Sequence, residues 1–243
     1  MSKSFLKNRF IDIINKLKKI RPQSRKVGEP MSQKGSIIEI YHFINPLASI
    51  CYDSEKIISD FACERYEKVS IRFIPFINFS IIKNQIEHDS NDYTLNDLNE
   101  LYTNSYHSAL AFYAASMQGK KYGRQFLMGL QHAVIENKLP VALPTFKQIV
   151  SEIKIDPEMF LEDYHSSWVK QQFIADQKLT QEMEVKMTPS CVVYTSNDNG
   201  VGYLIESSIS KDELHKICKY ENATQYSKSN LIQLLPNNNI KQN

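Results

Sequence analysis

Cysteine is the residue type in this sequence with the most reactive side chain, and the chain has four: Cys51, Cys63, Cys191 and Cys218. No two of them form a Cys-x-x-Cys pair. Dithiol oxidoreductases use that pair because one thiolate attacks a disulfide and a second thiol then resolves it. No spacing of cysteine with histidine fits a zinc site, and the six histidines show no ligand spacing. The sequence therefore predicts neither a metal site nor a local redox pair.

Composition argues against two further kinds of chemistry. The chain has only 7 glycines, which disfavours a Gly-rich nucleotide-binding loop, and we expect no cofactor. Residues 1–26 carry nine basic side chains and one acid, a net charge of +8, whereas the remainder of the chain carries −6. Nucleic-acid binding needs a basic body or stripe, so we expect no nucleic-acid partner. With 42% hydrophobic residues among 243, the chain can build a sizeable core.

Cys51 lies between two segments with the composition of buried strands. Ile37 to Phe43 is short, rich in strand-forming residues and followed by a turn at Asn45-Pro46, and Val69 to Phe76 is a second such segment. Between them, Cys51 to Glu67 has apolar residues at helical spacing. A β-α-β unit of this length predicts a parallel pair of strands with a right-handed crossover.

The middle of the chain is predicted to be helical, and its end to return to strands. The predicted helices are Leu95 to Gln118, Gly123 to Asn137, Thr145 to Lys154, a helix beginning at Asp156-Pro157, Trp168 to Met183, and Ser210 to Tyr220. The predicted strands are Ser190 to Thr195 and Val201 to Ile205, joined by a hairpin turn at Asn197 to Gly200. Residues 77–91 show no clear period. Trp168 is predicted to anchor a core or a domain interface.

The two ends of the chain differ from its middle. Residues 5–20 have helical apolar spacing with basic residues opposite, which indicates either a surface helix for anionic lipid or an acidic partner, or a solvated extension; we favour the extension. No secretory signal and no membrane span is visible, so we expect a cytoplasmic protein with reduced thiols. The predicted division has four parts. Residues 1–35 are a basic extension and linker, and residues 36–92 with 168–224 are a two-segment sheet domain. Residues 93–167 are a helical domain, and residues 225–243 are a polar tail.

Three local matches resemble a known family. Asn45 to Cys51 resembles the junction Asp-Pro-Leu-Cys-x-x-Cys of DsbA-like proteins, with Ala48 at the first cysteine and Cys51 at the second. Met187-Thr188-Pro189-Ser190 resembles the cis-proline loop beside that active site. The block from Ala109 to Leu127 resembles the cytosolic YjbH/SpxH branch of the family. The active-site-like loop would comprise Pro46, Leu47, Ala48, Ser49, Ile50 and Cys51, with Thr188 and Pro189 in the cis-proline loop.

The resemblance implies both a fold and a function. The fold is an α/β thioredoxin-like domain of the DsbA type with an inserted all-helical domain. The function is that of a non-catalytic adapter, which binds a transcription regulator of the Spx type and promotes its degradation by the ClpXP protease in a stress response. Ala48 replaces the nucleophile, so Cys51 is the residual redox candidate and no catalytic residue is expected.

Alternative interpretations stay open at this point. A thiol-disulfide oxidoreductase or isomerase could act through Cys51, either alone or paired with Cys191 near the cis-proline loop. We favour the interpretation that both cysteines are buried and pack as small hydrophobic residues. A kappa-type glutathione transferase would need Ser49 to hold the glutathione thiolate. His42 could perturb a thiolate at Cys51, although packing is the simpler role. Pro189 is expected to be cis, exposing a backbone edge that binds an extended peptide.

Overall fold

The computed structural model describes residues 18–20, 37–89, 92–196, 202–207 and 209–223. Its strands are β1 (Lys18–Ile20), β2 (Ile37–Ile44), β3 (Lys68–Pro75), β4 (Ser190–Tyr194) and β5 (Gly202–Glu206). Its helices are α2 (Ser49–Glu64), α3 (Phe79–Asp89), α4 (Leu95–Met117), α5 (Lys120–Gln131), the π-helix η1 (His132–Glu136), α6 (Leu143–Glu152), α7 (Pro157–His165), α8 (Ser167–Glu182) and α9 (Lys211–Ala223).

A single mixed sheet runs through the described part of the chain in the strand order β1-β5-β4-β2-β3. β2 and β3 are parallel over eight residues each, from Ile37 opposite Lys68 to Ile44 opposite Pro75. The predicted parallel β-α-β unit is therefore confirmed. β4 pairs antiparallel with β2 and with β5, which matches the predicted return to strands. The predicted hairpin turn at 197–200 lies outside the described residues.

The C-terminal end of the segment 5–20, for which the sequence favours a solvated extension over a surface helix, is neither of the two. Residues 18–20 form β1, which pairs antiparallel with β5 so that Lys18 lies opposite Leu204. Without β1, β5 would be an edge strand with unpaired backbone N–H and C=O groups, and satisfying those groups outweighs a local helical preference. Residues 5–17, the linker and the tail lie outside the described residues.

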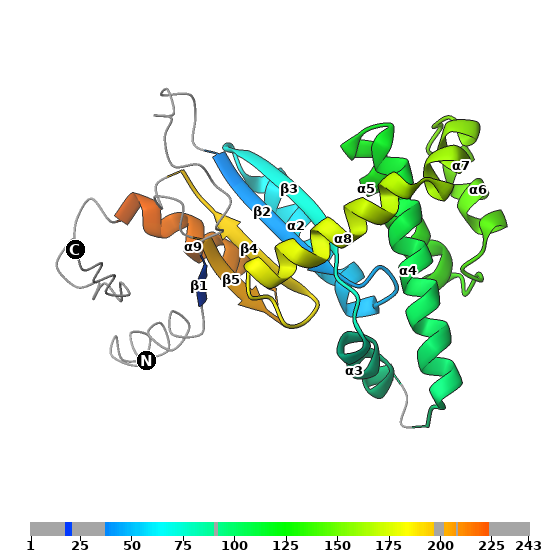
Figure 1. Cartoon of the computed structure of the whole chain (residues 1–243). Helices are drawn as coiled ribbons and strands as arrows, with labels where there is room; N and C mark the ends of the chain where they lie inside the picture. The colour runs from blue at the N-terminus through cyan, green and yellow to red at the C-terminus, as the bar shows by residue number, and fades with distance from the viewer. Residues whose placement is uncertain (1–17, 21–36, 90–91, 197–201, 208, 224–243) are drawn as a thin grey trace, which may run out of the picture.

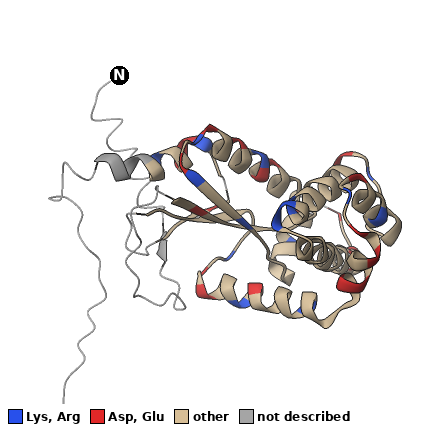
Figure 2. Ribbon diagram, turned by 90° about the horizontal axis from the view of Figure 1, so that it is seen from above, with Lys and Arg blue, Asp and Glu red and all other residues tan. Residues whose placement is uncertain are grey.

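The two faces of the sheet are covered by different helices. Ile38, Ile40 and Cys191 point to one face, where they form a buried cluster with α2 and α9. Phe43 and Val192 point to the other face and pack with side chains from α3 and from the C-terminal end of α8. Strand side chains alternate between faces, so one strand serves both clusters. Figure 2 shows the strands between α2 on one side and α8 on the other.

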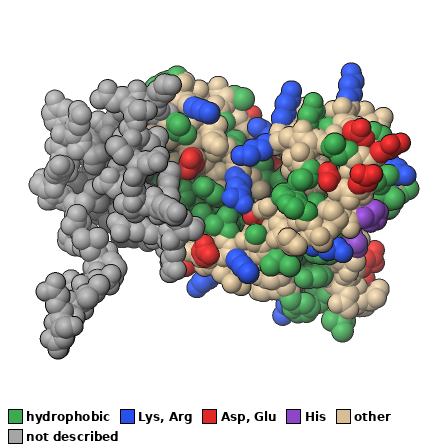
Figure 3. Space-filling view, turned by 45° about the horizontal axis from the view of Figure 1, so that its top comes forward, with side chains coloured by type: hydrophobic (Ala, Val, Ile, Leu, Met, Phe, Trp, Pro, Cys, Tyr) green, Lys and Arg blue, Asp and Glu red, His purple; other side chains and the backbone are tan. Residues whose placement is uncertain are grey.

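Helices α4 to α7 form a second body beside the sheet, and α8 runs back from it to the sheet (Figure 1). α4 begins with a capping box in which Thr94 and Asp97 exchange hydrogen bonds. It ends before Gly119, whose φ of 139° is open mainly to glycine. A Cβ atom on Gly123 would lie 1.9 Å from the Ser116 hydroxyl, so α4 and α5 pack together closely. Figure 3 shows acidic side chains gathered over this helical body.

The helical core contains a group of aromatic rings and reaches the sheet. Phe126 lies with its centroid 5.8 Å from that of Phe146 and 5.4 Å from that of Phe160. The same buried cluster includes Ile44 from β2 and Cys51 from α2. The helical body therefore packs directly against the loop that carries the predicted site. Its division from the sheet domain at residues 93 and 167 stays a prediction.

Several local predictions differ from the structure. Residues 77–91 showed no clear period, yet α3 occupies Phe79–Asp89. Thr145 does not cap α6; its hydroxyl donates to the Pro140 carbonyl at 2.8 Å, and the N-cap is Ala142. Trp168 is 48% exposed, so its predicted role as a core anchor is wrong. Asp156, in contrast, caps α7 as predicted.

Candidate functional site

The loop from β2 into α2 carries the predicted active-site-like residues. Pro46, Leu47 and Ala48 are buried, and Ala48 is the N-cap of α2 with extended backbone (φ −90°, ψ 125°). Its side chain cannot accept a hydrogen bond from the first turn. Ser49 and Ile50 follow and are exposed to solvent. The predicted position of the nucleophile, Ala48, therefore presents a methyl group at the N-terminus of α2.

Cys51 lies in the first turn of α2 and is fully buried. Burial is the main cause that raises the pKa of its thiol to about 12, and the charge of Glu55 adds to it. The Asn45 N–H, which donates to Sγ at 3.3 Å, and a contact with the Thr188 side chain oppose the shift only in part. Only the thiolate is a strong nucleophile, so Cys51 is unreactive at neutral pH.

The predicted cis-proline loop meets Cys51 directly before β4. The Thr188–Pro189 peptide bond is cis. Its neighbour Ser190 is buried, and the Ser190 carbonyl accepts a hydrogen bond from Nδ1 of His42 at 3.1 Å. Two loops that are more than 130 residues apart in sequence thus meet at one point beneath the N-terminus of α2.

His42 is a structural residue of the sheet. Because its Nδ1 donates to the Ser190 carbonyl, the neutral ring has Nε2 as the acceptor, and the Ser54 hydroxyl lies 3.0 Å from Nε2. Burial lowers the pKa of His42 to about 4, so the imidazole is neutral at pH 7. Its ring also lies edge-on to Phe73 with centroids 5.8 Å apart. It supplies no positive charge to Cys51.

Helix α3, which showed no clear sequence signal, holds the loop in place. The Gln85 amide Nε2 donates to the Leu47 carbonyl at 3.0 Å, and the Asn45 Nδ2 donates to Gln85 Oε1. Asn45 Oδ1 in turn accepts from the Leu47 N–H at 3.2 Å. These contacts satisfy loop backbone groups that an α-helix or strand would otherwise satisfy.

A pocket of about 130 Å³ opens between the loop, α3 and the cis-proline loop. The residues that line it are Ala48, Ser49, Ile50, Ile81, Asn84, Gln85, His88, Met187 and Thr188. Its walls combine apolar side chains with amide and hydroxyl groups. Of the predicted site residues, Ala48, Ser49, Ile50 and Thr188 line this pocket.

Cys51 and Cys191 belong to different environments. All four cysteines lie in the described residues and are thiols, with Cys63 exposed and the other three buried. Cys191 packs in the cluster between the sheet, α2 and α9, whereas Cys51 packs in the helical core. Burial raises the pKa of Cys191 as well. The structure contains no bond between the two.

Two buried carboxyl groups, which sequence reasoning did not single out, hold the helical body to the sheet domain. Glu55, one turn after Cys51, accepts a hydrogen bond from Gln131 of α5 at 2.7 Å. Burial raises the pKa of Glu55 to about 8. A position four residues after a buried thiol on the same helix shares its face, and that spacing could have identified Glu55.

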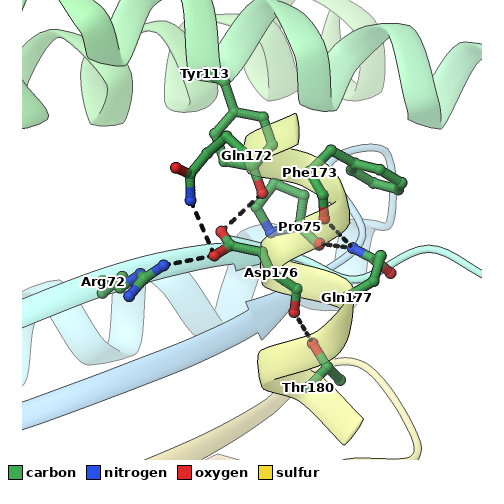
Figure 4. A network of polar contacts seen from close by, with 8 residues as sticks. All are labelled: Arg72, Pro75, Tyr113, Gln172, Phe173, Asp176, Gln177 and Thr180. Carbon is green, nitrogen blue, oxygen red and sulfur yellow. Dashed lines mark hydrogen bonds and ion pairs between the residues drawn. The ribbon is translucent and has the colours of Figure 1, made fainter. Parts of the chain in front are cut away.

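Asp176 on α8 is the second carboxyl group (Figure 4). It pairs with Arg72 of β3, accepts from the Tyr113 hydroxyl of α4 at 2.9 Å, and accepts from Gln172 at 3.2 Å. Gln177, on the next position, donates to the Pro75 carbonyl at 2.8 Å. These contacts join α4, α8 and β3 at one junction. This junction is separate from the pocket, because none of these residues lines the pocket.

The described residues offer neither a metal site nor a membrane-spanning helix. No group of three or more His, Cys, Asp or Glu side chains in the described part of the chain is placed to hold a metal ion. Among the described helices, none is both long enough and apolar enough to cross a lipid bilayer.

A cis-proline loop facing the N-terminus of a helix, beside a mixed sheet with an inserted helical body, defines a thioredoxin-fold protein of the DsbA type. The chain belongs to the thioredoxin family, whose sequence model matches residues 41–216. Its fold is also that of a disulfide isomerase-like protein from Nitrosomonas europaea (TM-score 0.59, 14% identity, 80% of this chain and 100% of that one). DsbM, a cytosolic disulfide reductase from Pseudomonas aeruginosa, shares it as well (TM-score 0.56, 15% identity, 78% and 100%).

The relatives in sequence belong to a narrower class of proteins than the structural neighbours. The ClpXP adapter protein SpxH of Staphylococcus saprophyticus is 28% identical over 193 residues, which are 78% of this chain and 67% of that protein. SpxH of Bacillus subtilis is 26% identical over 207 residues, 74% and 66% respectively. The resemblance to the YjbH/SpxH proteins is thereby confirmed. This chain spans about two thirds of the length of these relatives.

Proposed function

We propose that this protein is a non-catalytic adapter that binds a transcription regulator of the Spx type and promotes its degradation by ClpXP. One observation carries the proposal. A pocket beside the cis-proline loop is lined by Ala48, a residue without a thiol at the predicted position of the nucleophile. The names of the relatives from Staphylococcus and Bacillus support both the adapter role and the protease.

The thiol chemistry of the site supports binding rather than catalysis. Cys51 has no second cysteine within its turn, and burial raises its pKa to about 12. At pH 7 its thiolate fraction is on the order of 10⁻⁵, which argues against the alternative of a thiol-disulfide oxidoreductase acting through Cys51. Ser49, which a kappa-type glutathione transferase would need to hold the glutathione thiolate, is exposed at the pocket.

The pocket is our candidate site for the regulator. We infer that an extended segment of the partner lies along the cis-proline loop and places an apolar side chain beside Ile50 and Ile81. Ile50 is 46% exposed although it is apolar, and Met187, which also lines the pocket, is 36% exposed. Such side chains gain free energy when a partner covers them, roughly in proportion to the area buried. In this proposal the protein acts in the cytoplasm, where ClpXP and its regulators meet.

A reconstituted degradation assay tests the proposal. ClpXP and Spx are mixed with and without the full chain, and the loss of Spx is followed over time. We expect acceleration that persists in Cys51→Ser, because the thiol takes no part. Absence of both acceleration and Spx binding would overturn the adapter role, and loss of binding in a folded Cys51→Ser variant would overturn its thiol independence.

A matched pair of variants tests the pocket itself. Ile50→Asp places a charge on the wall of the pocket and is expected to weaken Spx binding at least tenfold. Tyr66→Asp makes the same kind of change at an apolar residue that is 88% exposed and does not line the pocket. Equal affinities of the two variants would place the regulator elsewhere on the molecule.

A further inference from the structure

Helix α3 forms one wall of the pocket, and its attachment to the rest of the protein changes along its length. Its pocket-lining residues have the spacing i, i+3, i+4 and i+7, which places them on one face: Ile81, Asn84, Gln85 and His88. At the start of α3, Ile81 and Ile82 are buried in apolar clusters. Residues 83–88 are all at least partly exposed, and of these Ile86 packs against the helical core. Polar contacts with the loop between β2 and α2, which lies next to α3 in Figure 1, therefore help to set where this part of the helix lies.

A closed ring of three hydrogen bonds ties α3 to that loop. Gln85 Nε2 donates to the Leu47 carbonyl at 3.0 Å, and Asn45 Nδ2 donates to Gln85 Oε1. Asn45 Oδ1 accepts from the Leu47 N–H at 3.2 Å. Asn45 is fully buried and Leu47 is 8% exposed, so a polar group left unpaired there would be costly. We define the Gln85 clamp as these three hydrogen bonds, which fix the distance between α3 and the loop.

The clamp holds together two walls of a pocket of about 130 Å³. A cavity of about 150 Å³ lined by apolar side chains holds one benzene ring. The pocket therefore has room for one side chain of the size of Leu or Phe, whereas the indole of Trp, with its second ring, exceeds it. Loss of the clamp would let α3 and the loop move apart and would enlarge the pocket.

The lining of the pocket also limits the charge of its occupant. None of the nine described residues that line it is Asp, Glu, Lys or Arg, whereas Ala48, Ile50, Ile81 and Met187 are apolar. A charged side chain that entered would lose water without gaining an ion pair, which is costly. An apolar side chain would instead gain free energy from the surface that it covers. Size and charge together indicate an uncharged, apolar side chain.

We propose that Gln85 determines the specificity of the pocket: its clamp fixes a width that admits one side chain of Leu or Phe size and excludes Trp. Gln85 acts here as a positioning residue, because its amide oxygen and nitrogen are engaged with Asn45 and Leu47 and need not bind the ligand. On the proposed function, on which this assignment rests, the segment that enters the pocket belongs to a regulator of the Spx type. That segment must then carry such a side chain where it lies along the cis-proline loop.

Capped peptides of the form Thr-Ser-X-Ser-Thr test the assignment on the full chain. X is Ala, Leu, Phe, Trp or Asp, and binding is followed by the shifts of the Ser49 and Thr188 amide signals in NMR spectra. We expect the Phe and Leu peptides to bind about tenfold or more tightly than the Ala and Asp peptides, because their side chains bury more apolar area. We expect the Trp peptide to bind about fivefold or more weakly than the Phe peptide, because a filled pocket resists a larger group.

Gln85→Met separates the clamp from the bulk of the side chain, because Met has a similar length and cannot form these hydrogen bonds. We expect this variant to bind the Trp and Phe peptides within about twofold of each other, since its pocket can widen. The Leu47 N–H is expected to exchange faster with solvent, because its acceptor Asn45 has lost a partner. Gln85→Glu keeps the acceptor for Asn45 and loses the donor to Leu47, so it is expected to relax the preference in part.

Asn84→Leu is the matched control. Asn84 lines the same wall of the pocket, and among the described residues it is Gln85, not Asn84, that bonds the loop. The control is expected to keep both the preference for Phe over Trp and the slow exchange of the Leu47 N–H. Urea denaturation of each variant checks that it is folded.

The outcomes separate the pocket from the regulator. The role of Gln85 would be overturned by binding of none of the peptides, by equal affinities of the wild-type chain for the Phe and Trp peptides, or by an unchanged preference in folded Gln85→Met and Gln85→Glu. Equal relaxation in Asn84→Leu would overturn it as well. Spx binding is measured on the same samples: a wild-type chain that selects Phe over Trp and does not bind Spx would overturn the proposed function and leave the specificity of the pocket standing. A chain that binds Spx and shows no selection would do the reverse.

Discussion

The helical body is held to the sheet domain at two junctions, and their buried carboxyl groups differ. Asp176 has three donors, one of them the guanidinium of Arg72. Glu55 has a single donor, Gln131, and its second oxygen has no partner among the described residues. Burial raises the pKa of both groups. The difference in partners decides how each group responds to that burial.

At the Asp176 junction the desolvation of a charge is offset by an ion pair and two hydrogen bonds, so the carboxylate can stay ionised. At the Glu55 junction the described residues form no ion pair with the carboxyl group. The charge of Arg124 opposes the effect of burial only in part, and with a pKa of about 8 the group holds a proton at neutral pH. Cys51 lies one turn away and is kept neutral by the same cause. The surroundings of Cys51 and Glu55 are thus neutral and buried.

The largest effect is expected from Ala48→Cys, which returns a thiol to the N-terminus of α2 while Cys51 stays in place. Ala48 lines the pocket, so the added sulfur has room. Backbone N–H groups and the helix dipole would lower its pKa to about 7 or below, against about 12 for Cys51. The thiolate fraction at pH 7 would then be about 10⁴–10⁵ times that of Cys51. The rate of alkylation at pH 7 measures it.

This experiment needs a background without the exposed thiol of Cys63, which would itself react. The comparison is therefore made in Cys63→Ser, with Ala48→Ser as the matched variant that adds a hydroxyl in place of the thiol. Alkylation no faster than that of the Cys63→Ser parent would mean that the loop, and not only the missing nucleophile, suppresses thiol chemistry.

The next largest effect is expected from Asp176→Ala. It leaves Arg72 without its partner and leaves the Tyr113 hydroxyl without an acceptor, and we expect a loss of about 3 kcal/mol in the free energy of unfolding. This is the lower end for a buried pair, because the Arg72 side chain is 47% exposed and can regain water. Urea denaturation measures the change.

Glu182→Ala is the matched control for Asp176→Ala, since it removes an exposed acid from the end of the same helix. We expect a change within about 0.5 kcal/mol. If both variants lost the same amount, the ion pair with Arg72 would not be what stabilises this junction.

Glu55→Gln tests the other junction and is expected to raise the free energy of unfolding, whereas Asp176→Ala lowers it. The pKa of Glu55 is raised in the folded state, so the folded protein binds the extra proton, and stability falls as pH rises from about 4.5 to about 8. A neutral amide removes this dependence of stability on pH, and its oxygen can still accept a hydrogen bond from Gln131. We expect a gain on the order of 2 kcal/mol at pH 7 and little change at pH 4.5. Denaturation at several pH values measures it, and an unchanged slope in the variant would show that Glu55 is ionised in the folded protein.

The elements that position the site could be predicted where local and tertiary preferences agree. β2 and β3 form strands as expected, with β2 buried at alternate positions and at its end and β3 buried in its last three residues. Asp156 caps α7 through its own side chain. α3 could not be predicted, because its 11 residues mix polar and apolar types and are ordered by contacts with a distant loop. β1 could not be predicted from the helical apolar spacing of residues 5–20, because its partner β5 is about 185 residues away in sequence.

The polar residues at the junctions were harder to find than the loops. The loops carry Pro46, Pro189 and a cysteine, each of which belongs to a short motif that can be recognised in the sequence. Glu55 and Asp176 look like ordinary surface acids on amphipathic helices. Only the positions of their buried neighbours, such as Phe173 three residues before Asp176, indicate that they point inward. Their partners come from other elements and could not be inferred from spacing.

The smallest effect is expected from Tyr113→Phe, which removes a single hydroxyl from the Asp176 junction. Tyr113 is buried on α4, and its O–H donates to Asp176 Oδ2 at 2.9 Å. Arg72 and Gln172 still satisfy Oδ1 in the variant, so the carboxylate loses one of three donors and we expect a cost of about 1 kcal/mol. Tyr106→Phe, on the same helix and packed against Phe173, is the control and should change stability by less than about 0.5 kcal/mol. In a double-mutant cycle, Tyr113→Phe is expected to cost almost nothing once Asp176→Ala is present, because its acceptor is gone. A cost that stayed the same would mean that the hydroxyl stabilises α4 through packing, and the junction would then depend on the ion pair with Arg72 alone.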